Sequence, residues 1–180
     1  MSRQRRYWDS DVFLSYFKKE RDKYDRLGGI IDAINNNEIE IITSAWTFCE
    51  VLYYKKNELT QEQADELQSF FRNDFIIPAN VDRDVAELAR NLFFQHEKLS
   101  NKDAIHIATA VKHHVLIFDT FDGDLINLNG KIGNPPLKIA KPNIPHQADL
   151  FEKDEKPKRI KAKREKSPAK KRSRPKQSKK

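Results

Sequence analysis

Residues 7–14 have the sequence YWDSDVFL, in which a short apolar strand ends at an acid and a helix begins at once. The strand is predicted over residues 6–8, and apolar residues then recur at helical spacing over residues 10–19. Asp9 therefore lies at a strand-to-helix junction. In an open α/β sheet, ligands bind outside the carboxyl ends of the parallel strands. The segment therefore predicts that Asp9 lies at a strand end where a ligand could bind.

The same alternation of apolar strands and amphipathic helices continues along the chain. Further strands are predicted at residues 39–42, 75–78 and 115–118, with a brief edge strand at 137–139. Helices are predicted at residues 23–36, 44–53, 60–72 and 85–92, and from residue 100 onward. This order predicts an α/β fold, a three-layer α/β/α domain with a central, mainly parallel sheet of four to five strands.

Charge divides the 180-residue chain into two parts. Residues 151–180 hold 15 Lys or Arg against 4 Asp or Glu, so residues 1–150 hold 19 against 23. The basic part contains three prolines and almost no large apolar residues, and it cannot offset the entropy of ordering itself. We expect one folded domain at 1–150 and a disordered Lys/Arg-rich tail at 151–180, which attracts nucleic acid by its charge.

Cysteine usage and hydropathy exclude several protein classes. Cys49 is the only cysteine, which excludes an intramolecular disulfide and a zinc site built on paired thiolates. No apolar run approaches the roughly 20 residues of a membrane span, and the N-terminus has no signal-peptide apolar region. We expect a soluble, cytoplasmic protein without a membrane partner.

Four acids lie beside predicted strands or near helix starts: Asp9, Glu50, Asp103 and Asp122. Each has a structural interpretation when taken alone; Asp9 suits a helix N-cap and Asp103 a capping box after Ser100. Parallel strands would bring them together, and clustered carboxylates repel one another unless a cation neutralises them. Oxygen ligands favour Mg²⁺ or Mn²⁺ over zinc. The pattern predicts a divalent-metal site.

Four motifs, in order over roughly residues 5–140, resemble those of PIN domains. They are YWDSDVFL at 7–14, Ser44 with Glu50-Val51-Leu52, SNKDAIHIATA at 100–110, and LIFDTFDGDL at 116–125. The resemblance implies a metal-dependent endoribonuclease of the VapC type, the toxin of a type II toxin–antitoxin pair. It also implies that Asp9, Glu50, Asp103 and Asp122 are the catalytic metal ligands for Mg²⁺ or Mn²⁺, and that RNA is hydrolysed by in-line attack of water.

Other positions receive supporting roles from the same resemblance. Ser10 and Thr120 would hold the ligands or the water, and Asp11 stands where the family usually has Asn. Asp119 and Asp124 leave the identity of the fourth ligand open. We expect Lys102, Lys112 and the tail to hold the phosphate backbone. RNA, a cognate antitoxin and a second copy of the chain in a homodimer are the expected partners, with aromatic residues at 53, 54, 70 and 71 as interface candidates.

Two alternatives remain open at this point. Asp9-Ser10-Asp11 also matches the start of haloacid dehalogenase-like phosphatases, but that hypothesis gives Glu50 and Asp103 no task. The second alternative is a non-catalytic nucleic-acid-binding protein that acts through the basic tail. The presence of all four acids argues against it.

Overall fold

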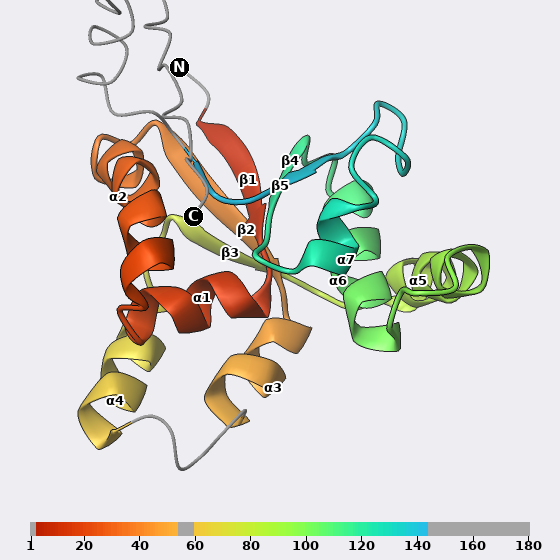
Figure 1. The fold of residues 1–180 in the computed structure, drawn as a ribbon. Helices are drawn as coiled ribbons and strands as arrows, with labels where there is room; N and C mark the ends of the chain where they lie inside the picture. Colours follow the sequence, from red (N-terminus) through yellow and green to blue (C-terminus); the bar gives the residue numbers. More distant parts are fainter. Residues whose placement is uncertain (1–2, 54–59, 144–180) are drawn as a thin grey trace, which may run out of the picture. The chain divides into compact units, whose positions relative to one another are not determined.

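The computed structural model describes residues 3–53 and 60–143, and the expected tail at 151–180 lies outside them (Figure 1). The strands are β1 (Gln4–Trp8), β2 (Ile39–Ser44), β3 (Ile76–Ala79), β4 (Ile117–Asp119) and β5 (Lys138–Ala140). The helices are α1 (Ser10–Phe17), α2 (Arg21–Asn35), α3 (Trp46–Tyr53), α4 (Gln61–Phe70), α5 (Arg83–Gln95), α6 (Asn101–Lys112) and α7 (Gly123–Ile126). Within these ranges no helix is long and apolar enough to cross a bilayer.

The five strands form one parallel sheet in the order β3-β2-β1-β4-β5. The chain starts in the centre at β1, builds outward through β2 and β3, and then returns to the other side of β1 with β4 and β5. The strand order therefore reverses between β1 and β4. Such a switch point separates the loops of the two halves and leaves a crevice at the carboxyl ends of the strands, where ligands bind.

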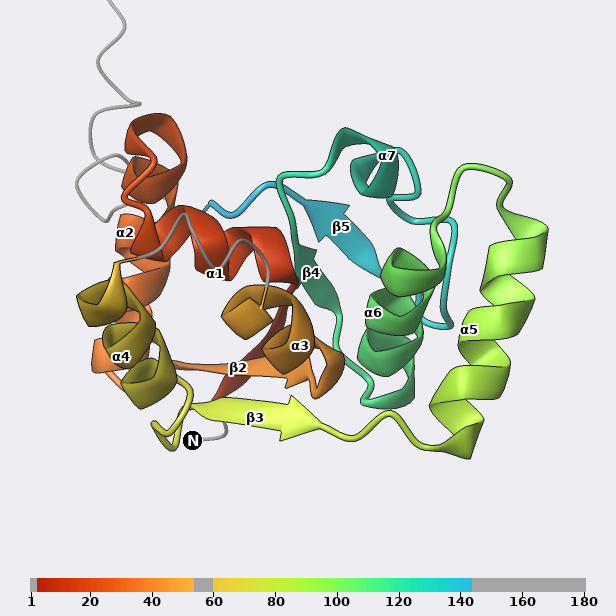
Figure 2. The ribbon, with the colours of Figure 1, turned by 90° about the horizontal axis from the view of Figure 1, so that it is seen from below.

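Helices cover both faces of the sheet, which confirms the three-layer prediction (Figure 2). On one face, α1 to α4 bury a core of aromatic and aliphatic side chains that includes Trp8, Phe13, Leu27 and Leu67. On the other face, α5 and α6 pack against Tyr7 and the remaining side of the same strands. Side chains of a strand point alternately to its two faces, so β1 supplies both cores.

The predicted elements all occur, and one element was not predicted. Helix α7 is only four residues long and begins at the N-cap Asp122, so it has too little periodicity to be recognised from sequence. The capping box of Thr60 and Gln63 is present at α4. Phe70 and Phe71 pack against other aromatic rings near α1 and α3, so they serve the core of the domain more than an interface. The side chains of Tyr53 and Tyr54 lie outside the described set.

Candidate active site

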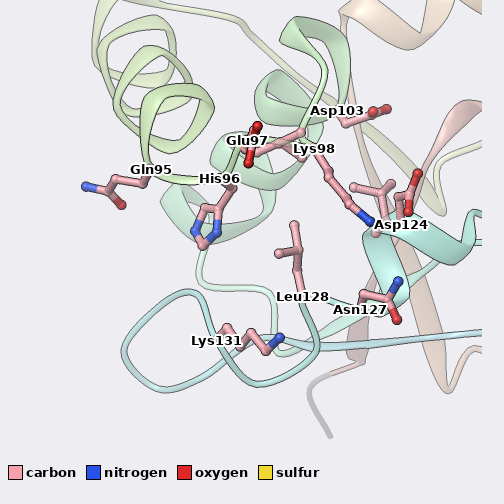
Figure 3. Close-up of a pocket in the computed structure, with 11 residues that line it drawn as sticks. Gln95, His96, Glu97, Lys98, Asp103, Asp124, Asn127, Leu128 and Lys131 are labelled. Atoms are coloured by element: carbon pink, nitrogen blue, oxygen red, sulfur yellow. The ribbon is translucent and has the colours of Figure 1, made fainter.

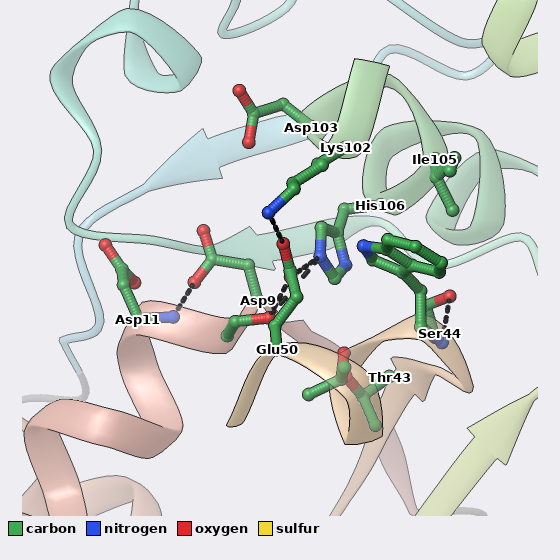
Figure 4. Close-up of polar contacts among 12 residues, drawn as sticks. Asp9, Asp11, Thr43, Ser44, Glu50, Lys102, Asp103, Ile105 and His106 are labelled. Atoms are coloured by element: carbon green, nitrogen blue, oxygen red, sulfur yellow. Dashed lines mark hydrogen bonds and ion pairs between the residues drawn. The ribbon is translucent and has the colours of Figure 1, made fainter. Parts of the chain in front are cut away.

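The predicted acids gather at the carboxyl edge of the sheet around the β1–β4 switch point. Asp9 follows β1 and caps α1, because its carboxylate accepts hydrogen bonds from the backbone N–H groups of Asp11 (3.1 Å) and Val12 (3.3 Å). Glu50 extends from α3 and Asp103 lies in the first turn of α6 (Figure 4). Residues that begin a helix, such as the N-cap Asp9, therefore also lie at the carboxyl edge of the sheet.

Glu50 is held by three neighbours. Ser10 Oγ donates a short hydrogen bond to Glu50 Oε2, and His106 Nε2 lies 2.8 Å from the same oxygen. Lys102 Nζ lies 3.5 Å from the other oxygen, Oε1. Although partial burial raises the pKa of Glu50, the hydrogen bonds from His106 and Ser10 outweigh it and lower that pKa to about 2. Glu50 is therefore ionised at neutral pH.

Asp9 and Asp103 have the opposite electrostatic environment. Burial raises the pKa of Asp9 well above its usual value, and the neighbouring carboxylate of Asp11 raises it further. The pKa of Asp103 is also raised, first by burial; a hydrogen bond from Ser100 opposes this and the charge of Asp122 adds to it. Both carboxyl groups therefore favour the arrival of positive charge, as a proton or a cation.

Backbone N–H groups after β4 donate hydrogen bonds to Thr120, Asp122 and Asp11. Thr120 is fully buried and its Oγ1 accepts the N–H of Asp122 at 2.9 Å. The Asp122 carboxylate caps α7 and accepts the N–H of Asp124 at 2.7 Å. The Asp11 carboxylate accepts the N–H of Phe121 at 3.2 Å, which ties the start of α1 to this loop. The supporting residues thus fix the loop that carries Asp122.

Asp119 and Lys112 form ion pairs with residues outside the acid cluster. Asp119 forms a buried, two-pronged ion pair with Arg6, at 2.7 Å to Nε and 2.5 Å to Nη2. Its carboxylate oxygens are thereby occupied within the sheet. Lys112 lies at the far end of α6 from Asp103 and pairs with Asp84 at 2.5 Å. A phosphate contact by Lys112 would therefore lie away from the acids, and it stays a prediction.

The donor chemistry of the site fits a hard divalent cation. Its groups are carboxylate oxygens, two of which belong to acids with raised pKa values, and the ammonium of Lys102 already stands beside Glu50 in the position of a counter-ion. Among residues 3–53 and 60–143, however, no three acid, histidine or thiol groups lie close enough together to enclose an ion as they stand. The acids would have to turn toward a cation, Asp103 from its bond to Ser100 (2.6 Å).

His106 is a site contact that the sequence did not single out. A lone histidine three residues after Asp103 is usually structural, yet here the ring is 2% exposed and contacts both Glu50 and the Tyr7 hydroxyl. The available signal was its helical spacing from Asp103, which puts both residues on one face of α6. Tyr7 gave no signal, because an aromatic residue in a buried strand is ordinary core.

A cavity of about 320 Å³ opens beside the acids (Figure 3). One wall is the turn from α5 to α6, with His96 and Lys98, and the other is α7 and the turn after it, with Asn127 and Lys131. Asp103 lies on its rim, so the cavity and the acid cluster share a boundary. Its lining combines apolar leucine side chains, amide and ammonium donors, and the carboxylates of Glu97, Asp103 and Asp124.

A family model for the PIN domain matches residues 6–131, which include all four predicted acids. The chain belongs to the PIN domain family. That membership agrees with the α/β fold and removes the case for a haloacid dehalogenase-like phosphatase. No curated protein sequence matches the chain significantly.

Several solved structures of toxins and toxin–antitoxin complexes share this fold. VapC20 of Mycobacterium tuberculosis, a sarcin–ricin-loop-cleaving toxin, is 15% identical with a TM-score of 0.56, over 66% of this chain and 91% of that one. A toxin–antitoxin complex from Klebsiella pneumoniae is 20% identical with a TM-score of 0.55, over 77% and 98%. VapBC2 of Rickettsia felis, bound to a promoter DNA fragment, is 16% identical with a TM-score of 0.56, over 76% and 98%.

Proposed function

We propose that this PIN domain is a metal-dependent endoribonuclease and the toxin of a type II toxin–antitoxin pair. The observation that carries the proposal is the convergence of Asp9, Glu50 and Asp103 on the switch point of the sheet, where the pKa values of Asp9 and Asp103 call for positive charge. Asp122 adds its charge to that of Asp103.

Asp9, Glu50, Asp103 and Asp122 would hold Mg²⁺ or Mn²⁺. Such an ion, when bound, lowers the pKa of an attacking water and stabilises the leaving oxygen of a phosphodiester. The products expected from this hydrolysis are a 5′-phosphate and a 3′-hydroxyl.

The surrounding residues prepare the carboxylates for this task. Ser10 and His106 hold Glu50 through one oxygen, and Thr120 orders the backbone that leads to Asp122. Lys102 is 55% exposed and is held only at 3.5 Å from Glu50 Oε1, so its ammonium is free to move to a substrate phosphate once another cation neutralises Glu50.

The cavity beside Asp103 supports a single-stranded substrate. Its volume suits one nucleotide, its leucines offer an apolar surface to a base, and Asn127 offers hydrogen bonds to a base edge. Proteins that recognise RNA by sequence usually bind unpaired bases that can be splayed out in this way. Lys98 and Lys131 would meet the flanking phosphates.

The expected partners follow from charge and from exposed apolar surface. The basic residues of 151–180 suit the backbone of RNA. Phe93 and Phe94 are 37% and 72% exposed on α5, beside an apolar cavity of about 410 Å³, which suits a protein partner such as an antitoxin or a second copy. The similar structure from Klebsiella pneumoniae is itself a toxin–antitoxin complex.

The proposal is tested by incubating the full-length protein with end-labelled single-stranded RNA, the matching DNA and a small phosphate ester, each with Mg²⁺, Mn²⁺ or EDTA. We expect cleavage of RNA only, only with metal, and with 5′-phosphate products. RNA binding without cleavage of any substrate in any metal would support the non-catalytic alternative instead.

A further inference from the structure

His106 is almost fully buried and bonded at both ring nitrogens, yet nothing in the chemistry of phosphodiester hydrolysis requires it. We propose that His106, oriented by Tyr7, is a positioning residue that fixes the Glu50 carboxylate in the site. The inference rests on the proposed function only for the role of Glu50 as a metal ligand.

A chain of three hydrogen bonds runs from the backbone of β2 to Glu50. The N–H of Ser44 donates to Tyr7 Oη at 3.0 Å, Tyr7 Oη lies 2.7 Å from His106 Nδ1, and His106 Nε2 lies 2.8 Å from Glu50 Oε2. The Tyr7 hydroxyl accepts the Ser44 N–H and has its own hydrogen to donate to Nδ1. In the order of donors that the proposal uses, Tyr7 donates to Nδ1 and Nε2 donates to Glu50.

Packing holds this order in place. Tyr7 is 0% exposed, its ring stacks on Phe118 with centroids 4.7 Å apart, and it meets the His106 ring edge-on at 5.9 Å. Neither ring is free to turn, and little water reaches the chain to compete for its hydrogen bonds. A fully satisfied buried network of this kind specifies one arrangement of its members.

As a result, the two carboxylate oxygens of Glu50 have different environments. Oε2 receives hydrogen bonds from Ser10 and His106, whereas Oε1 is left beside the Lys102 ammonium at 3.5 Å. Glutamate is a flexible side chain that loses much rotamer freedom when it is ordered. Since His106 and Ser10 order it in advance, less of that cost remains when a cation arrives at Oε1. Hydrogen bonds to a ligating carboxylate commonly contribute in this way to metal affinity.

The first test is the protonation state of the His106 ring in the full-length protein, read from its ¹⁵N and ¹H resonances at neutral pH without metal. His106→Gln assigns the signal among the five histidines. We expect a hydrogen on Nε2. A ring with hydrogen on Nδ1 alone would overturn the proposed order.

The second test is the affinity of the full-length protein for Mn²⁺ without RNA, measured by calorimetry. His106→Gln keeps an amide N–H near the position of Nε2 and should stay within a few-fold of wild type, whereas His106→Leu should lose about 10- to 100-fold. Tyr7→Phe removes only the hydroxyl and should fall between them. His114→Gln, at an exposed histidine, is the control, and thermal melting checks that each variant folds.

Wild-type affinity in folded His106→Leu would overturn the positioning role. If wild-type protein itself binds no Mn²⁺, the metal role of Glu50 in the proposed function fails. The ring protonation state still decides separately whether the chain from Tyr7 to Glu50 exists.

Discussion

Asp9 is almost fully buried beside Asp11 and caps α1 through two backbone N–H groups. Its raised pKa means that the folded state binds its proton more tightly than the unfolded state does, so ionisation of Asp9 at neutral pH opposes folding. A bound cation would reverse that penalty. Asp9 thus lowers the stability of the metal-free domain, and it is also a residue that the proposed function needs.

Replacing Asp9 by Asn should separate these two effects. Asn keeps an acceptor for the cap but removes the charge, so in EDTA the melting temperature should equal or exceed that of wild type. Wild type should gain stability on adding Mn²⁺, by about 2.7 kcal/mol at a concentration 100 times its Kd, and Asp9→Asn should gain much less. Thermal melts with and without Mn²⁺ measure both. Asp25→Asn, at an exposed acid, is the control, and an Asp9→Asn protein with the full Mn²⁺ gain would contradict the ligand role.

The sequence predicts where individual acidic residues lie, but it does not predict their side-chain partners. Strand ends can be located from apolar runs, so Asp9 and Asp122 were placed at the correct edge. The partner of Glu50 is His106, 56 positions away, and the partner of Asp119 is Arg6, 113 positions away. No local spacing relates such pairs, so the sequence offers Asp119 as a candidate ligand whereas the structure pairs it with Arg6.

The pair of β1 and β4 carries the most buried charge among the described elements. The side chains of Arg6 and Asp119 are only 7% and 1% exposed. Burial raises the pKa of Asp119 even though the hydrogen bonds and charge of Arg6 lower it, so the pair does not fully offset its removal from water. Its value lies in joining the two strands that flank the site.

Removing one member of this pair should therefore destabilise the domain strongly. We expect Arg6→Met to lower the free energy of unfolding by about 3–5 kcal/mol, because Asp119 is left charged and buried. The double variant Arg6→Met with Asp119→Leu should recover most of that loss. Urea denaturation of the three proteins measures it. Equal stability of Arg6→Met and wild type would show that the pair is not formed.

Helix α7 and the turn after it form one wall of the cavity beside Asp103. Asn127 is exposed on that wall, so Asn127→Trp should fill the cavity without disturbing the core. Loss of a bound base costs about 1–3 kcal/mol, so we expect RNA affinity to fall about tenfold, with cleavage at saturating RNA largely retained. Kd and KM for single-stranded RNA measure this, and Gln68→Trp on α4 is the control. Unchanged affinity in Asn127→Trp would exclude the cavity as a nucleotide site.

Elements with a clear period were predictable and short ones were not. The amphipathic pattern of α5 and the capping residues of α4 and α6 gave those helices their positions. Helix α7 has one turn, defined by the Asp122 side chain and not by any apolar stripe. The cavity depends on how α7 faces the α5–α6 turn, which is a tertiary arrangement that no single segment encodes.

Across the whole chain, acidic and basic residues are segregated, with a net charge of −4 on residues 1–150 and +11 on residues 151–180. An acidic surface repels RNA, so the basic segment should contribute attraction that does not depend on sequence. The division into a domain and a tail remains a prediction.

Truncation after Leu150 should leave the chemistry intact and weaken binding. We expect the cleavage rate at saturating RNA to stay close to wild type. The dependence of log Kd on log salt should become shallower by about 0.7 for each RNA phosphate that the basic segment no longer neutralises. RNA binding measured across salt concentrations tests this. A full-length protein with residues 151–180 in scrambled order should bind as wild type does, and a truncated protein with the wild-type salt dependence would refute the role of the segment.

Under the proposed function, the four carboxylates hold a divalent cation that promotes RNA cleavage. This is tested by incubating full-length wild type and the double variant Asp9→Ala/Asp103→Ala with a mixed RNA substrate in Mg²⁺, Mn²⁺ or EDTA. We predict cleavage by wild type with metal and none in EDTA or by the folded variant. Cleavage in EDTA, or at the wild-type rate by the variant, would contradict a metal-dependent site built on these carboxylates.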